Sequence, residues 1–436
     1  MLNFLFTKTP LMFFYQSLWR DEAFSFVLSQ KNIGELLIAT AKDFNPPLYY
    51  LVLKFWVLLF GKSEVALRSL SLIFFWLMLY VIYLLLINVY KFSWKKSYFY
   101  LLLIVINPLL VYYAFEVRMY SLLAFLAALS FYALLTKKKR LYLIATVAGL
   151  YTHYFFVFLI LGEILYLLLT NKRKDWWKFL KQYLIIGGLF LPWLIFFLVN
   201  KDIQTANDFW ILKKSLPSLI DLPGYIYTGY EKNFLFFEKN ITNLSLALIL
   251  TIGFAFLKNY FFKKKHQQFV IALIVWGILI PVFVLVISYF KPIFLPRYLI
   301  FATVGLLLLL IYALDQFHLL LRLIILVPLF LVTVNYHKLQ LKERKKADLR
   351  KVIGEISRLA KKNDLLLVTN ELDYFTAEYY FDANRVFIYG KTYEEIPAYV
   401  GKVLIPEEKI TAHFPRYPQK AFILNLDYSY SIQAEF

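Results

Sequence analysis

The stretch "SLSLIFFWLMLYVIYLLLINVY" (Ser69–Tyr90) contains no charged residue. A helix of about 20 apolar residues is long enough to cross the hydrocarbon core of a bilayer. Similar stretches recur along the 436-residue chain, which is 61% hydrophobic and only 17% charged. A soluble domain has roughly a quarter of its residues charged. The sequence therefore predicts a polytopic α-helical membrane protein.

The apolar stretches and the basic clusters between them predict the topology. We expect about eleven transmembrane helices, including a weak first one. They are Leu2–Ser17, Ser69–Tyr90, Tyr98–Tyr113, Tyr120–Thr136, Leu141–Leu150, Phe155–Thr170, Tyr183–Asn200, Thr242–Leu257, Val270–Phe290, Tyr298–Leu314 and Leu319–Val334. By the positive-inside rule, the basic clusters should be cytoplasmic. These clusters are Lys91–Lys96, Lys137–Arg140, Asn171–Lys181 and Phe261–His266.

The apolar segment Pro46–Gly61 needs separate treatment, because it carries Lys54 and begins with two prolines. If it crossed the membrane, all four basic clusters would lie outside, against the positive-inside rule. We therefore expect a juxtamembrane helix along the outer interface, with Tyr, Trp and Lys at interfacial depth. The N-terminus is then inside, and residues 18–62 form the first outer loop.

The last hundred residues have a different character. Residues 1–335 form the predicted transmembrane domain, and residues 336–436 a small α/β domain outside the membrane. Its predicted elements are a helix with Leu349, Ile353, Ile356 and Leu359 on one face, and strands at Asp364–Asn370 and Ala421–Tyr430.

Charge and missing motifs restrict the function. The net charge is +20, but nucleic acid is a poor partner, since the positive charge lies in short loops between spans. The absence of cysteine excludes disulfides and thiolate metal sites. No P-loop, GxSxG or HExxH motif supports ATP-driven transport, serine hydrolysis or a zinc protease.

Several carboxylates are predicted at the outer ends of spans, where ionisable groups are functional candidates. Asp21 and Glu22 follow the first apolar segment. They either cap a helix N-terminus or act as a general base or metal ligands. Asp43 precedes two prolines, and is either a cap or a second cavity carboxylate. Glu116 lies between two spans, where it either pairs locally with Arg118 or faces the same cavity.

Arginines also gather at these outer ends, where the positive-inside rule disfavours them. They are Arg20, Arg68, Arg118 and Arg297, in a chain that otherwise prefers Lys. Arginine offers a rigid two-pronged donor for phosphate or carboxylate. We expect an anionic ligand at the outer leaflet, with a divalent cation (Mg or Mn) left open. Lys54 suits the same purpose, whereas His153 is either a packing residue or a ligand contact.

These segments, in this order, resemble the glycosyltransferase C superfamily, and especially the bacterial relatives of protein O-mannosyltransferases and of lipid A aminoarabinose transferase. The resemblance is carried by "LWRDEAFS", "DFNPPLYYLVLKFWVLLFG", "SEVALRSLS", "EVRMYSLL", "YTHYFF" and "PRYLIFA". It implies a multi-pass enzyme of the cell membrane. The enzyme would move a sugar from a polyprenyl-phosphate donor to a protein, lipid or glycan acceptor outside.

The resemblance also implies roles for individual residues. Asp21 takes the position of the catalytic base, supported by Glu22, and these two would hold a metal if one is used. The candidates for the donor phosphate are Lys54, Arg68, Arg118 and Arg297. The candidates for the cavity wall are Asp43, Glu116, Tyr120, His153 and Tyr298.

The alternative from another class is a transporter or flippase for an anionic lipid-linked substrate. Such a protein should have broken helices in two related halves, with its charges near the midplane. The predicted charges lie at one face instead. A non-catalytic scaffold would leave the outward carboxylates and arginines unexplained.

Overall fold

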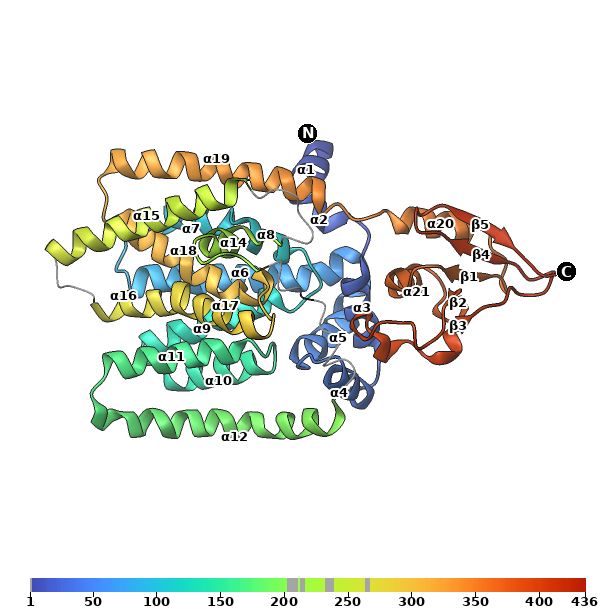
Figure 1. Ribbon diagram of the computed structural model, residues 1–436, viewed down its shortest axis with the longest axis horizontal. Coiled ribbons are helices and arrows are strands. Elements are labelled where there is room, and N and C mark those ends of the chain that lie inside the picture. The colour runs from blue at the N-terminus through green and yellow to red at the C-terminus, as the bar shows by residue number, and fades with distance from the viewer. Residues whose placement is uncertain (1, 202–210, 212–215, 232–238, 263–266) are drawn as a thin grey trace.

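The computed structural model describes all residues except 1, 202–210, 212–215, 232–238 and 263–266. It has two parts, a helical bundle and a C-terminal α/β domain at one end of it (Figure 1). The connection is α19, a single helix from Leu319 to Glu343. It runs well past the predicted span end at Val334, and the short non-helical segment 344–348 then leads into the C-terminal domain.

The bundle is built from long apolar helices whose axes run roughly together (Figure 1). The central helix is α18 (Ile300–Asp315), preceded by the 3-10 turn η4 (Pro296–Leu299). Its span is 83% buried, as expected of a helix that is apolar on every side. The other bundle helices are α6 (Glu64–Asn88), α7 (Trp94–Val105), α8 (Pro108–Ala114), α9 (Tyr120–Leu135), α10 (Lys139–Leu150), α11 (Phe156–Thr170), α12 (Trp176–Asn200), α14 (Leu222–Thr228), α15 (Lys239–Phe262), α16 (Gln267–Ile274) and α17 (Ile280–Phe290).

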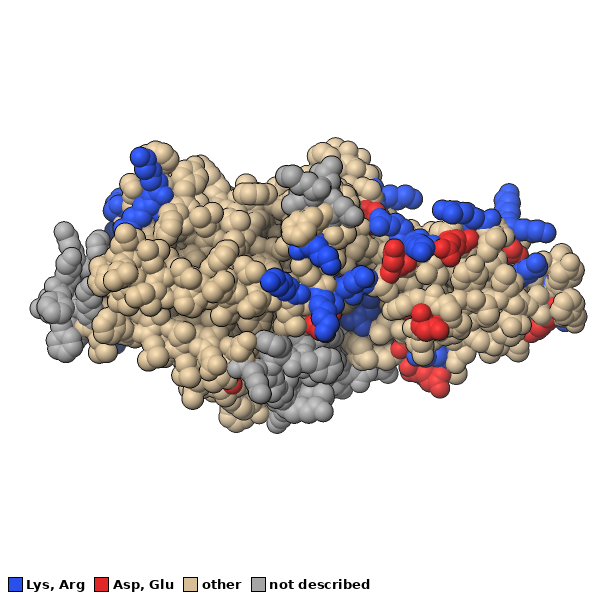
Figure 2. Space-filling model, turned by 90° about the horizontal axis from the view of Figure 1, so that it is seen from above, with Lys and Arg blue, Asp and Glu red and all other residues tan. Residues whose placement is uncertain are grey.

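The outer helices leave large apolar side chains exposed. The apolar window of α12 is only 11% buried and that of α19 only 17%. Figure 2 shows the consequence, a broad uncharged surface over the bundle, with charged side chains gathered toward its ends and over the C-terminal domain. In a lipid environment these side chains have apolar neighbours, so the protein is a multi-pass membrane protein.

The span count differs from the predicted eleven. Among the described residues, six helices are long and apolar enough to cross a membrane, or seven if α7 and α8 form one span bent by 76°. The bend lies at Asn107, which caps α8, and Pro108, which begins it. Helices α9 and α11 are apolar but shorter. The predicted first span is two short helices, α1 (Leu2–Lys8) and α2 (Met12–Tyr15), because Pro10 lacks the N–H that would continue the first.

The first outer loop forms three helices at the end of the bundle nearest the C-terminal domain (Figure 1). They are α3 (Arg20–Gln30), α4 (Ile33–Lys42) and α5 (Leu48–Phe60). With 13 residues, α5 is about 20 Å long, which is too short for the hydrocarbon core. Its juxtamembrane position remains a prediction.

The C-terminal domain contains α20 (Leu349–Leu359), α21 (Tyr374–Tyr380) and a five-stranded sheet of order β3-β2-β1-β4-β5. Four strands are parallel: β1 (Leu365–Val368), β2 (Val386–Tyr389), β3 (Ile410–Thr411) and β4 (Ala421–Leu424). The predicted strand Ala421–Tyr430 is wrong as a single strand, since it turns at positive-φ Tyr428 into antiparallel β5 (Tyr430–Gln433). Strands β2 and β3 were not predicted, and Leu359 is 58% exposed on α20.

Candidate functional site

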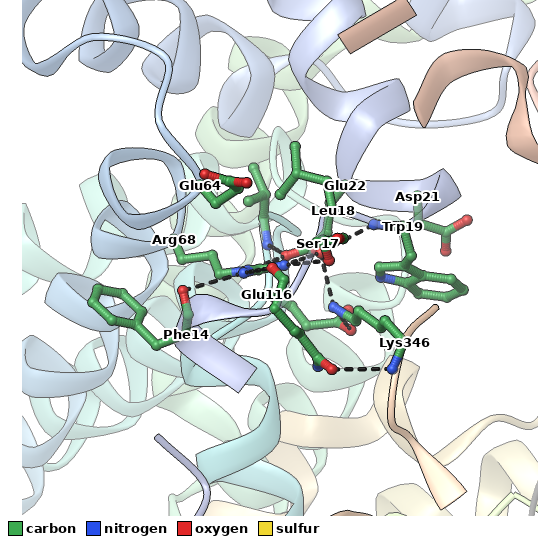
Figure 3. Close-up of polar contacts among 12 residues, drawn as sticks. Phe14, Ser17, Leu18, Trp19, Asp21, Glu22, Glu64, Arg68, Glu116 and Lys346 are labelled. Atoms are coloured by element: carbon green, nitrogen blue, oxygen red, sulfur yellow. Dashed lines mark hydrogen bonds and ion pairs between the residues drawn. The ribbon is translucent and has the colours of Figure 1, made fainter. Parts of the chain in front are cut away.

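Glu22 lies at the centre of a buried ionic network where α3 meets α6 and the segment after α19 (Figure 3). Its carboxylate accepts two hydrogen bonds from Arg68, from Nε at 2.8 Å and Nη2 at 2.7 Å. Lys346 Nζ lies 2.8 Å from the same group, and the backbone N–H of Val117 donates at 3.2 Å. The Glu22 carboxylate therefore ties four separate chain segments together and has a structural role.

Arg68 is fully buried in this network. Besides Glu22, its guanidinium donates to the carbonyls of Phe14, Gln16 and Ser17. Its five N–H donors are all engaged within the chain, so a donor phosphate would have to displace one of these contacts to reach Arg68. Lys54, another candidate for the donor phosphate, is also engaged within the chain. Its ammonium donates to the carbonyls of Ser29 (3.2 Å) and Lys31 (2.8 Å) at the C-terminal end of α3.

Glu116 joins the same network rather than pairing with Arg118. It is 1% exposed, accepts a hydrogen bond from the Tyr112 hydroxyl, and lies 3.3 Å from Lys346 Nζ. Two buried carboxylates, Glu22 and Glu116, are thus balanced by two cations, Arg68 and Lys346. Glu116, predicted at the cavity wall, therefore has its contacts within this network.

Asp21 points away from this network, although it is the next residue to Glu22 (Figure 3). Its side chain is 22% exposed and accepts a hydrogen bond from Arg20 Nε at 3.0 Å. Burial disfavours the charged carboxylate, but the positive charges of Arg20, Arg118 and Arg297 outweigh it and lower the pKa of Asp21 to about 2. Asp21 is therefore an ionised carboxylate facing several arginines.

Arg118 and three aromatic residues lie close to Asp21. Arg118 Nη1 lies 3.5 Å from Ser25 Oγ, and its Nε is buried without a hydrogen-bond partner among the described residues. The rings of Tyr120 and Tyr298 stack at 6.3 Å, and the His153 ring is 5.1 Å from that of Tyr298. The structure thus brings these predicted wall residues together, from the loop between α10 and α11 and from the starts of α9 and η4.

His153 is neutral in this surrounding. Burial lowers its pKa to about 3, and the nearby charges of Arg118 and Arg297 act in the same direction. Its Nδ1 accepts a hydrogen bond from the backbone N–H of Phe155 at 3.1 Å. The imidazole can therefore pack or hydrogen-bond, but it carries no positive charge toward an anionic ligand.

Asp43, at the C-cap of α4, is the second carboxyl of this region. Burial raises its pKa to about 7; Arg118 and a 2.6 Å hydrogen bond from Asn45 oppose the rise, and the Asp21 charge adds to it. The site thus contains one carboxylate that is ionised at neutral pH in the free protein and one whose pKa lies near neutral pH.

Arg297 also lies against the aromatic cluster. Its Nη1 is 3.2 Å from Glu231 Oε2, and its guanidinium lies 5.8 Å from the centre of the Tyr298 ring. Glu231 was not predicted as a site residue, because it lies in a polar stretch between predicted spans. Arg344 and Lys346 were not predicted either, because their run "KERKK" resembles a solvated linker.

The acidic pair does not form a metal site. Glu22 is occupied by Arg68 and Lys346, and Asp21 points elsewhere (Figure 3). No group of three His, Asp or Glu side chains suited to a metal ion occurs in the described part of the chain. We therefore derive no step through a divalent cation.

A cavity of about 550 Å³ lies at the other end of α6 and is not part of this site. It is lined by Asn88, Val89, Leu135, Thr136, Tyr166, Gln268 and Phe269.

Comparison with other proteins identifies the fold. No family model and no curated protein matches the sequence. Among solved structures, the chain is similar to ArnT from Cupriavidus metallidurans in the apo state, with a TM-score of 0.64 over 97% of this chain and 92% of ArnT. The chain has the fold of ArnT. Sequence identity is 12%, so the likeness concerns the fold.

The same protein bound to undecaprenyl phosphate gives a TM-score of 0.62 over 97% of this chain and 93% of that one, again at 12% identity. ArnT has the glycosyltransferase C fold. The predicted fold class, a polytopic helical membrane protein with a small C-terminal α/β domain, is therefore confirmed.

Proposed function

We propose that the protein is a membrane glycosyltransferase that moves a sugar from a polyprenyl-phosphate donor to an acceptor on the extracytoplasmic side. The observation that carries this proposal is the fold shared over 97% of the chain with an ArnT structure bound to undecaprenyl phosphate. It is supported by the grouping of Asp21, Arg118 and Arg297 at the end of the bundle next to the C-terminal domain.

Arg118 and Arg297 are our candidates for the donor phosphate. Both are partly buried cations near Asp21 and the tyrosine cluster, where a guanidinium interacts with an anion more strongly than in water. In the reaction, the bond between the anomeric carbon and the phosphate oxygen breaks, and the phosphate keeps the electron pair. Arginines fixed at that position stabilise the charge as it develops.

Asp21 is our candidate for the general base. The acceptor oxygen forms a bond to the anomeric carbon, and its proton passes to the Asp21 carboxylate. A pKa of about 2 makes the free protein a weak base. A bound phosphate offsets the charges of Arg118 and Arg297, and this raises the proton affinity of Asp21 once the donor is in place.

The test is sugar transfer by purified protein in detergent. Intact protein and Asp21→Asn are incubated with a panel of polyprenyl-phosphate sugars and an envelope extract, and released polyprenyl phosphate is measured. We expect release by the intact protein and a loss of about 100-fold or more in the variant. Asp382→Asn is the matched control, because that carboxylate is 46% exposed and its contacts, with Arg385 and the backbone N–H of Asn384, lie within the C-terminal domain.

Equal release by the intact protein and Asp21→Asn would remove Asp21 from the chemistry. No release from any donor by folded, full-length protein would favour the transporter or flippase instead. A flippase would move labelled polyprenyl-phosphate sugar across a vesicle membrane without cleaving it.

A further inference from the structure

Glu231 is a buried carboxylate that pairs with Arg297 through one of its two oxygens. The side chain of Glu231 is 4% exposed. The residue lies two positions after Gly229, whose φ of +69° turns the chain at the end of α14. Oε2 pairs with Arg297 at 3.2 Å, whereas Oε1 is buried and has no hydrogen-bond partner among the described residues. A buried carboxylate oxygen without a partner is costly, which indicates that a donor group from a ligand or from water completes it.

The groups near Glu231 favour an anionic ligand that also carries hydrogen-bond donors. Arg297 and Arg344 both act electrostatically on Glu231 and on Tyr113. Arg344 donates to the Gly229 carbonyl at 3.1 Å, and its guanidinium lies 4.2 Å from the centre of the Tyr112 ring. Two guanidiniums thus lie near the Glu231 carboxylate, and its Oε1 is a hydrogen-bond acceptor beside them.

In a polyprenyl-phosphate sugar, the anomeric carbon is bonded directly to a phosphate oxygen. If Arg297 holds the phosphate, its partner Glu231 lies within one sugar ring of it. We propose that Glu231 recognises the donor sugar by accepting a hydrogen bond at Oε1 from a sugar hydroxyl or amino group. This inference rests on the proposed function and adds a specificity-determining residue to it.

The proposal has a consequence for substrate choice. A site that accepts a hydrogen bond at a buried carboxylate discriminates strongly against an analogue lacking the donor group, since the carboxylate oxygen is then left unpaired. We therefore expect donors deoxygenated at the recognised position to be poor substrates. The polyprenyl phosphate product, which has no sugar, should bind without help from Glu231.

The test compares Glu231→Gln with intact protein in two assays. The first measures binding of undecaprenyl phosphate, and the second measures KM for the productive polyprenyl-phosphate sugar. The Gln variant keeps an oxygen for Arg297 but replaces the free acceptor by a donor. We expect KM to rise about 10-fold or more, with affinity for undecaprenyl phosphate changed by less than about twofold. Glu395→Gln is the control, since Glu395 is exposed in the C-terminal domain and accepts a hydrogen bond from the backbone N–H of Thr392.

Two results would overturn the proposal. Equal weakening of both ligands would mean that Glu231 only positions Arg297, and an unchanged KM would mean that it does not contact the sugar. If Glu231→Gln does not fold, Glu231→Asp keeps the charge but withdraws the oxygens, and the same comparison of the two ligands decides. Failure of the intact protein to transfer any sugar would instead refute the proposed function, and the two failures are distinguishable.

Discussion

At the scale of single residues, Lys346 is a cation that contacts both buried acids of the ionic network, Glu22 and Glu116. It contacts Glu22 at 2.8 Å and Glu116 at 3.3 Å with its side chain only 7% exposed. Removing one partner of a buried ion pair leaves an unpaired charge, which costs about 3–5 kcal/mol. We expect Lys346→Met to lower the thermal unfolding midpoint in detergent markedly. Lys342→Met, at a side chain 82% exposed, should leave it unchanged. Equal midpoints for the two variants would contradict the structural role of the network.

Asp43 gives the site a pH dependence of defined sign. Burial raises its pKa from 3.8 to about 7, so the group is neutral below pH 7 and gains a negative charge above it. That charge partly neutralises Arg118 and repels an anionic donor. We expect KM for the donor to rise between pH 6 and pH 8, and Asp43→Asn to flatten this rise. A rise of the same size in the Asn variant would show that another group titrates.

At the scale of elements, two helices of the bundle approach each other at glycines. The five-residue π-helical segment η3 (Val275–Leu279) lies between α16 and α17 and packs on α18. A Cβ on Gly277 would lie 2.7 Å from the backbone of Gly305 and Leu306. Backbone atoms, unlike a side chain, cannot avoid this clash by changing rotamer. We therefore expect Gly277→Ala to separate the two helices and lower the unfolding midpoint. Gly253→Ala, in α15 with open space around it, should have little effect.

A second feature at the scale of elements is a set of buried hydrogen bonds that joins helices α9, α10, α11 and α12. Glu163 of α11 is fully buried and accepts hydrogen bonds from Ser130 (2.6 Å) and Tyr142 (2.7 Å), and Tyr142 contacts the Tyr183 hydroxyl of α12 at 2.8 Å. These bonds fasten α12, which has few buried side chains, to the bundle. We expect Glu163→Leu to loosen α12, measured as faster proteolysis of the loop before Trp176. Glu355→Leu, outside the bundle, should not change that rate.

The sequence predicts elements well where composition decides them and poorly where geometry does. Apolar runs located the long helices, because apolar length alone determines a span. The break at Pro10 and the hairpin at Tyr428 depend on turns of the backbone. A prediction from apolar runs alone does not place such turns. Within the candidate site, Asp21, Arg118 and Arg297 were predicted because ionisable groups at span ends are conspicuous. Arg68 and Glu22 look the same in sequence, and only their mutual contact reveals a structural pair.

At the scale of the whole molecule, the C-terminal domain packs directly on the helix that carries Asp21. Phe24 of α3 is 5% exposed, and its ring lies 5.4 Å from that of Phe375 in α21. Phe26 and Tyr379 form a second ring pair at 5.0 Å. The Tyr380 hydroxyl also accepts a hydrogen bond from the backbone N–H of Leu18 at 2.9 Å. An apolar contact of this kind couples the domain to α3, so the position of Asp21 depends on it.

This coupling predicts how the two parts unfold. With α3 packed between them, bundle and C-terminal domain should unfold in one calorimetric transition in detergent. Phe24→Ser places a hydroxyl in the contact and removes the ring that meets Phe375, so we expect it to split the transition in two and to reduce sugar transfer. Leu426→Ser, at a side chain 71% exposed in the same domain, is the control for substitution to serine. Two transitions already present in the intact protein would mean that the domain is only tethered, and activity would then survive Phe24→Ser.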